Sequence, residues 1–389
     1  MTKLTSRDRV LAAIHHEEPD RVPLILGVDL TTGMMMHAYR RVKHHLKVER
    51  DDRYLYAWPE LGAADPDETV LRLLGSDARG VHDCFPQATY NRNRNRPQGT
   101  PYIDDWGVGQ PEIAPGEYFP RIHPLKDAKT PDELGTYPHW PDMTDPTRFM
   151  HANERAVELA EESEYAIFAS PWLLFPFERA CQLQGLDTFL MNMALHTDFA
   201  SALLNRIAGL CKTHMAHFLE ALDDNVDVIV IGDDLGTQES LLISPDMYRR
   251  ILKPIHADWI AFIKARTKAK IFFHTDGDVF PLLDDLVEIG VDILNPIQTS
   301  AGRMSNLTLL KRRYGKNLCF CGGIDTHYVL PHGSTEEVHE EVRRVIRQLG
   351  PGGGYMVASV HSIMNDVPAE NVIAMADAVK AYGHYPLGH

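Results

Sequence analysis

Long apolar runs are missing from this sequence of 389 residues. No stretch approaches the roughly 18 to 20 apolar residues that a membrane-spanning helix requires, so we expect no membrane insertion. Residues 1–23 carry charges among their apolar positions and lack the apolar core of a secretory signal. These absences predict a soluble protein of the cytoplasm.

Cysteines and basic clusters are also scarce. The five cysteines are an odd number and mostly lie far apart, which favours reduced thiols over a disulfide framework. The formal net charge is −15, and the one dense group of arginines is Arg92, Arg94 and Arg96. Because nucleic acids and anionic membranes are bound by clustered Lys and Arg, neither is an expected partner.

The N-terminal part of the chain, residues 1–160, has weak periodicity. A helix is predicted after an N-cap at Thr5 or Ser6, and residues 22–26 form an apolar run typical of a first strand. The chain then becomes rich in Pro and Asp, with two exceptions, a helical pattern at 68–74 and a hairpin pattern at 102–108. We interpret this part as a decorated, loop-rich region.

Residues 161–383 alternate short β-branched or aromatic runs with longer amphipathic segments. The predicted strands are 165–169, 226–231, 270–273, 292–294, 318–320 and 355–357. Repeated strand-helix units indicate a parallel sheet, either doubly wound or closed into a barrel. No linker composition divides the chain, so residues 1–389 are expected to form a single domain.

Polar residues follow five successive predicted strands, beginning at Gly232, His274, Asn295, Cys321 and Ala358. In a barrel the chemistry lies in the loops after the strands, all around one face. A doubly wound sheet would concentrate such residues at one switch point instead. The pattern therefore favours an α/β fold of the (β/α)8 TIM-barrel type.

The segments at these strand ends resemble the uroporphyrinogen decarboxylase superfamily over roughly Tyr165 to Gly383. The segments that carry the resemblance are GDDLGTQESLLISPDMYRRILKP, HTDGDVFPLLDDLVEIGVDILNPIQ, CGGID and VHSIMNDVPAENVIAMADAVKAYG. The superfamily includes porphyrinogen decarboxylases and zinc-dependent methyltransferases that work with corrinoid proteins. The resemblance thus implies a TIM barrel and one of these two reactions.

The methyltransferase branch holds zinc with a His-x-Cys and a later Cys. Here His274 matches the histidine, Asp276 replaces the first cysteine, and His361 lies near the second. The resemblance therefore implies a site for zinc or another divalent metal at His274, Asp276 and His361. Cys321, which follows another predicted strand, is a further candidate ligand. For each histidine the alternative is an ordinary hydrogen-bonding role, and for Cys321 it is a small core residue.

The decarboxylase branch uses arginines near its N-terminus to bind substrate carboxylates, and residues 28–37 contain none. Asp233, Asp234, Asp276 and His361 are the candidate catalytic residues under either reaction, as general bases or as groups that stabilise charge. Asp233 and Asp234 face opposite ways in an extended chain, so one of them is expected to reach the cavity. Their alternative role is to cap a helix.

Four residues are predicted to bind the substrate: Trp172, Asn295, Gln298 and Met35. Trp172 follows a strand and would line the barrel mouth, which favours a partly apolar organic substrate. Asn295 and Gln298 would shape the pocket by hydrogen bonding. Met35 belongs to a run of three methionines that suits an adaptable pocket wall or, alternatively, a buried helix start.

The leading hypothesis is a metal-dependent methyltransferase or demethylase that moves a methyl group between a small organic substrate and a corrinoid or thiol acceptor. A corrinoid would be supplied by a partner protein, and a homodimer is compatible with the sequence. The first alternative is a cofactor-independent decarboxylase of a tetrapyrrole or another carboxylic acid. The second is a non-catalytic protein that binds a corrinoid or tetrapyrrole.

Overall fold

A parallel sheet of seven strands forms the centre of the molecule. The computed structural model describes residues 4–114, 117–162, 164–171 and 175–387. The strand order is β1-β6-β7-β8-β9-β10-β11, and all neighbours are parallel. Their bounds are β1 (Ala78–His82), β6 (Ala166–Ser170), β7 (Val228–Gly232), β8 (Lys270–His274), β9 (Ile293–Ile297), β10 (Cys319–Ile324) and β11 (Tyr355–Ser359).

An extended segment, residues 22–26, closes this curled sheet into a barrel. On one side Ile25 donates a backbone hydrogen bond to Val357 of β11, and Val357 donates one to Pro23. On the other side the backbone N–H of Asp77, just before β1, donates to Leu24. The first predicted strand therefore occupies the eighth strand position, although its ladder is too short to count as a regular strand.

The strands bury both of their faces, as expected for a parallel sheet covered by helices. One set of alternating side chains, including Phe168, Val230, Phe272 and Met356, fills the barrel interior. The other set, including Ile231 and Phe273, packs between the barrel and the helices. Val10, Ala13 and Ile14 of the first helix join the interior cluster and so close one end of the barrel.

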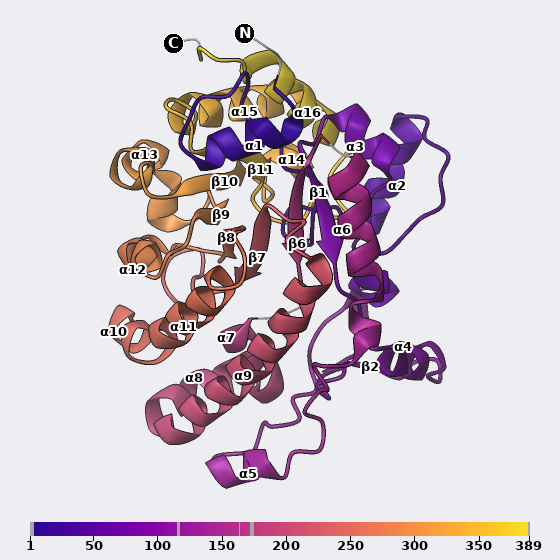
Figure 1. Ribbon diagram of the computed structural model, residues 1–389, viewed down its shortest axis with the longest axis vertical. Coiled ribbons are helices and arrows are strands. Elements are labelled where there is room, and N and C mark those ends of the chain that lie inside the picture. The colour runs from indigo at the N-terminus through magenta and orange to yellow at the C-terminus, as the bar shows by residue number, and fades with distance from the viewer. Residues whose placement is uncertain (1–3, 115–116, 163, 172–174, 388–389) are drawn as a thin grey trace.

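Helices surround the sheet, with α1, α15 and α16 near both termini at one end and α5, α8 and α9 at the other (Figure 1). Their bounds are α1 (Ser6–Ile14), α2 (Met36–His45), α3 (Glu68–Leu74), α4 (Gln87–Arg94), α5 (Pro131–Gly135), α6 (Met150–Glu162), α7 (Pro176–Gln184), α8 (Leu186–Leu195), α9 (Thr197–Leu222), α10 (Pro245–Met247), α11 (Lys253–Lys264), α12 (Leu283–Glu288), α13 (Leu307–Tyr314), α14 (Val329–His332), α15 (Thr335–Leu349) and α16 (Ala369–Tyr382). In the described part of the chain, every helix is too short or too polar to span a lipid bilayer.

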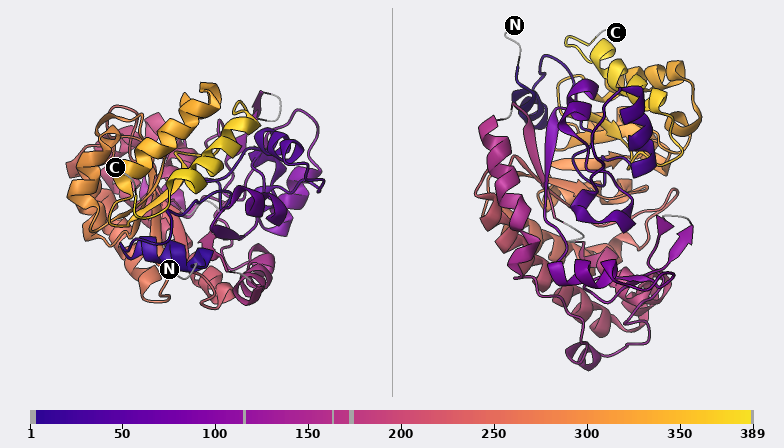
Figure 2. Two further views of the ribbon diagram at one scale, coloured as in Figure 1. Left: turned by 90° about the horizontal axis from the view of Figure 1, so that it is seen from above. Right: turned by 90° about the vertical axis from the view of Figure 1, so that its right-hand side faces the viewer.

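The N-terminal third packs along one side of the barrel (Figure 2). Its short strands form two hairpins, β2 (Tyr102–Ile103) with β3 (Gly109–Gln110) and β4 (Glu112–Ala114) with β5 (Glu117–Tyr118). The first hairpin confirms the pattern seen at 102–108, and α3 confirms the helix predicted at 68–74. The N-cap at Thr5 is also confirmed, since its side chain accepts a hydrogen bond from Asp8.

The six strands predicted from residue 165 onward are confirmed as β6 to β11, and the barrel fold is confirmed with them. All six end beyond their predicted last residue, and the longest extensions are those of β9 to Ile297 and β10 to Ile324. Both extensions run into the polar residues at the strand ends. Hydrogen bonds between neighbouring strands of the barrel therefore hold part of the loops that were expected to carry the chemistry.

Candidate metal centre

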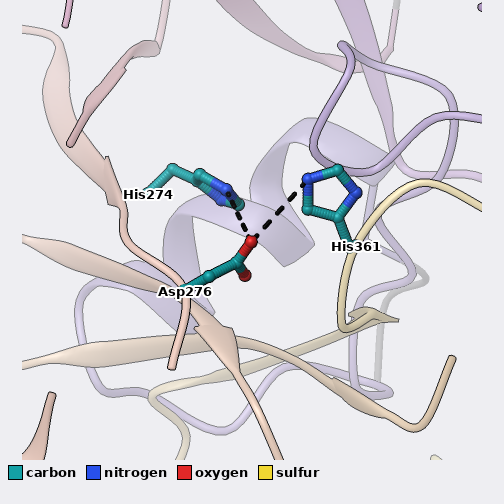
Figure 3. Close-up of side chains that lie close together, drawn as sticks. All are labelled: His274, Asp276 and His361. Atoms are coloured by element: carbon teal, nitrogen blue, oxygen red, sulfur yellow. Dashed lines mark ion pairs between the residues drawn. The ribbon is translucent and has the colours of Figure 1, made fainter. Parts of the chain in front are cut away.

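The side chains of His274, Asp276 and His361 converge at the carboxyl ends of β8 and β11 (Figure 3). His274 is the last residue of β8, and His361 follows the end of β11 at Ser359. The Nε2 atom of each histidine lies 3.8 Å from Asp276 Oδ2. One ligand atom from each residue lies within 4.8 Å of the other two. We call these three residues the ligand cluster.

Asn295, in β9, fixes the orientation of His274. The Nδ1 atom of His274 lies 2.6 Å from Asn295 Oδ1, and the Asn295 amide group donates to the Cys321 carbonyl at 3.3 Å. Because that amide nitrogen is used as a donor, Oδ1 is the acceptor for the His274 Nδ1–H. The Nε2 atom of His274 is then left with a free lone pair directed toward Asp276, which is the arrangement of a metal-binding histidine.

The ligand cluster fits a divalent metal ion. Two donor atoms of one tetrahedral zinc ion, with bonds of about 2.0–2.1 Å, lie about 3.4 Å apart, close to the 3.8 Å seen here. Asp276 Oδ1 is buried without a hydrogen-bond partner in the described structure, although buried carboxylate oxygens are normally satisfied. Two imidazoles and a carboxylate suit zinc and neighbouring transition metals. Three protein ligands would leave a coordination position open.

Burial and the nearby carboxylates set the protonation of the two histidines. Burial lowers the pKa of His361 below its usual value, so this imidazole is neutral at pH 7. Burial acts in the same direction on His274, but the charges of Asp276 and Asp234 outweigh it and raise the pKa of His274. A metal cation bound at His274 Nε2 would take the place of the proton that these two carboxylates favour there.

Asp234 lies beside the cluster, whereas Asp233 points away from it. Asp234 Oδ1 accepts the backbone N–H of Asp276 at 3.0 Å and lies 3.9 Å from His274 Nε2. Burial and the Asp276 charge raise the pKa of Asp234. Asp233 is fully buried and accepts the backbone N–H groups of Phe177 and Glu178 at the start of α7. These contacts match helix capping, which was the alternative role predicted for Asp233.

Cys321 and Met35 also lie outside the ligand cluster. The Cys321 side chain is fully buried in the barrel interior with Cys319 and Met356. This position matches its alternative role as a small core residue. Met35 packs against Leu55 and Tyr56 and precedes α2. Both residues support the site through their backbone, because Cys321 accepts from Asn295 and Met35 donates to Ile363.

Of the remaining predicted substrate residues, Gln298 lies next to the cluster and Trp172 lies outside the described residues. Gln298 is buried, and its side-chain oxygen accepts the backbone N–H of Gly277 at 2.7 Å. Because Gly277 follows Asp276 directly, this bond holds the loop that carries the carboxylate. Asn295, predicted to shape the pocket, contacts His274 instead.

Two cavities adjoin the cluster. The larger, of about 850 Å³, is lined by Asp234, Gly236 and a mainly apolar wall. The smaller, of about 250 Å³, is lined by polar side chains together with Asp276 and His361. Gly236 lines both cavities. Two molecules could therefore approach the cluster from different directions.

No role in the site was predicted for Asp29 or Glu178, yet both lie near the cluster. Asp29 is buried and accepts hydrogen bonds from Thr31 and Thr32. Glu178 lines the larger cavity, and burial, with the charges of Asp234 and Asp233, raises its pKa to about 8. The position of Asp29 after the first strand was a usable signal, but Glu178 lies inside a helix where no strand-end pattern applies.

Comparison with known proteins identifies the family. Residues 152–382 match the family model described as uroporphyrinogen decarboxylase (URO-D), which is more than half of the chain. The chain belongs to the URO-D family. The match covers the ligand cluster and all strands from β6 to β11.

The relatives within the URO-D family are distant. A uroporphyrinogen decarboxylase of Coxiella burnetii (strain Dugway 5J108-111) is 25% identical over 223 residues, 55% of this chain and 56% of the relative, so the chain spans little more than half of that relative's length. One of Legionella pneumophila (strain Philadelphia 1) is 23% identical over 384 residues, 95% of each protein. A solved structure, a methyltransferase from Methanosarcina mazei, matches with a TM-score of 0.64 and 17% identity over 97% of this chain and 99% of the other. This likeness shows a shared fold.

In this URO-D family member, Asn295→Ala should weaken metal binding without removing a ligand. Loss of the Asn295 oxygen frees the His274 ring to rotate and to change its tautomer. Loss of such a supporting hydrogen bond lowers metal affinity about 10- to 100-fold. Competition with a chromophoric chelator measures the change. Thr299→Ala is the control, because Thr299 bonds to Gly323 instead of a ligand. Equal affinities in both variants would contradict the tautomer assignment.

Proposed function

We propose that this protein is a metal-dependent methyltransferase or demethylase that moves a methyl group between a small organic substrate and a thiol or corrinoid acceptor. The observation that carries the proposal is the convergence of His274, Asp276 and His361 beside two cavities. The fold neighbour from Methanosarcina mazei is called a methyltransferase, and the proposal extends that activity to this chain.

The residues around the cluster have separate roles in this proposal. His274, Asp276 and His361 would hold the cation, which when bound would supply a Lewis acid that activates a thiol or polarises a methylated heteroatom. Asn295 keeps the Nε2 lone pair of His274 directed inward. Asp234 Oδ1 accepts the Asp276 N–H, so Oδ2 is the atom that can take a proton from an incoming thiol or hydroxyl. Its raised pKa makes Asp234 a better proton acceptor near neutral pH.

Metal analysis and methyl-transfer assays test the proposal together. The purified protein should contain about one equivalent of zinc or another divalent transition metal per chain. Transfer from methyl ethers, thioethers or methylated amines to a thiol or to reduced cobalamin should fall on chelation and return with added metal. A folded protein that binds no metal would contradict the proposal. Tight corrinoid binding without transfer to any acceptor would favour the non-catalytic carrier.

Decarboxylation is the second candidate, because the curated relatives are uroporphyrinogen decarboxylases. A porphyrinogen with several carboxylates needs several cationic partners in its pocket. Among the described residues that line the larger cavity, Arg121 is the one arginine, and Glu178 and Asp234 would repel a polyanion. Release of carbon dioxide from a porphyrinogen by the metal-free protein would nevertheless favour this candidate over methyl transfer.

A further inference from the structure

The larger cavity has the size and lining of a binding site for an organic molecule. At about 850 Å³ it lies in the range of ligand pockets, which is about 300–1,000 Å³. Its apolar wall consists mainly of Leu30, Leu61, Tyr118, Phe119, Phe177 and Leu242. Apolar side chains form most of its surface, so its few ionisable groups decide which charge it accepts.

Those ionisable groups are distributed unevenly. Arg121 and Asp187 are exposed and of opposite sign, so they nearly cancel at the rim. Glu178 and Asp234 are more buried, and Asp234 borders the ligand cluster. The Glu178 carboxylate bonds to the neutral amide of Gln182 at 3.0 Å. No lysine or arginine among the described lining residues pairs with either acid.

The acidic groups give the sign of the molecule that fits. Asp234 and Glu178 line the cavity, and the Asp234 carboxylate contacts Asp276 of the ligand cluster. Burial, with the charges of Asp234 and Asp233, already raises the pKa of Glu178 to about 8, because a further negative charge in this apolar cavity is costly. A cation in the cavity would compensate these acids and favour the ionised form of Glu178, whereas an anion would add to the repulsion.

We propose that the larger cavity binds a methylated organic cation, a quaternary ammonium or sulfonium compound, beside the ligand cluster. Aromatic rings such as those of Tyr118, Phe119 and Phe177 attract such cations through their faces, and Glu178, once ionised beside the cation, adds a charge contact. Such a cation would be the substrate, and its role as the methyl donor rests on the function proposed above.

Methyl transfer from such a cation to a thiol balances without a further reactant. The bond between carbon and the cationic nitrogen or sulfur breaks, and its electron pair stays on that atom to give a neutral amine or thioether. The acceptor sulfur supplies the electron pair of the new carbon-sulfur bond. The thiol proton passes to Asp234, which lies between the larger cavity and the cluster.

Calorimetric titration with choline and its neutral isostere 3,3-dimethyl-1-butanol tests the inference. The two probes have the same shape, so the difference in affinity measures the response to charge. We expect choline to bind at least about tenfold more tightly, which corresponds to about 1.4 kcal/mol. Equal affinity, no binding of either probe, or tighter binding of succinate would overturn the proposal.

Glu178→Gln assigns the effect to one side chain. The variant keeps the acceptor for Gln182 and should lose about tenfold in choline affinity, with unchanged affinity for the neutral isostere and unchanged metal content. Glu220→Gln, at an exposed position on α9, is the matched control and should keep full choline affinity. Metal without a preference for choline would overturn this inference alone. A preference for choline without metal would overturn the proposed function alone.

Discussion

Replacing His274 by alanine should release the metal from a barrel that stays folded. His274 supplies one of three ligand atoms, and its ring is fixed by Asn295. Loss of a supporting hydrogen bond alone costs about 10- to 100-fold in metal affinity, so we expect loss of the ligand to cost roughly 100-fold or more. Methyl transfer should fall by at least the same factor at limiting metal. Elemental analysis after dialysis against a chelator measures the release.

Two variants separate a ligand from a nearby histidine in that experiment. His327→Ala removes an imidazole that lines the smaller cavity but lies outside the ligand cluster, so its metal content should not change. Asp276→Asn removes the charge at the centre of the cluster and should behave like His274→Ala. Circular dichroism checks the fold of each variant. A His274→Ala protein that keeps its metal would show that the ion is bound elsewhere.

Most of the barrel could be predicted because its second half follows the alternation of apolar runs and amphipathic helices. β1 was missed for a physical reason. It contains Arg79, whose side chain is fully buried, pairs with Glu68 and stacks on the ring of Tyr165 at 3.5 Å. In the sequence this arginine interrupts the run of apolar residues by which a buried strand is predicted, so the segment looks like a loop. Only the folded structure shows that its charge is compensated.

The ligand cluster could be predicted in part. The spacing of His274 and Asp276 places both after one strand, and the resemblance to the family drew attention to His361. The choice between Asp233 and Asp234 could not be made from sequence, because it depends on the start of α7 and on His256, which contacts Asp233 at 2.9 Å. Those groups come from distant segments that meet only in the barrel.

Barrel closure and the cluster are linked through the segment at residues 22–26. This segment pairs with β11 and then leads to Gly33 and Met35, whose backbone atoms bond to Ile363. Ile363 is two residues beyond His361. The loop that carries His361 is thus held between β11 and the closing segment. A change that loosens the closure should therefore also reduce metal affinity.

Asp77→Ala should produce the largest loss of stability, because Asp77 fastens the closing segment to β1. Its fully buried carboxylate pairs with Arg9 at 2.6 Å and Arg21 at 2.9 Å and accepts the backbone N–H of Leu24. Removing one partner of a buried ion pair costs about 3–5 kcal/mol, since the remaining charges lose their compensation. The midpoint of urea unfolding measures the loss.

Asp77→Asn distinguishes charge from hydrogen bonding in this closure. The amide oxygen can still accept from Leu24, but its neutral group no longer compensates Arg9 and Arg21, so most of the loss should remain. Asp284→Ala is the control, because it removes an exposed pair with Arg313 that contributes about 0–1 kcal/mol. If Asp77→Ala costs no more than this control, the closure does not depend on Asp77. If the Asp77→Ala protein is destabilised and also binds metal more weakly, the closure supports both the barrel and the position of His361.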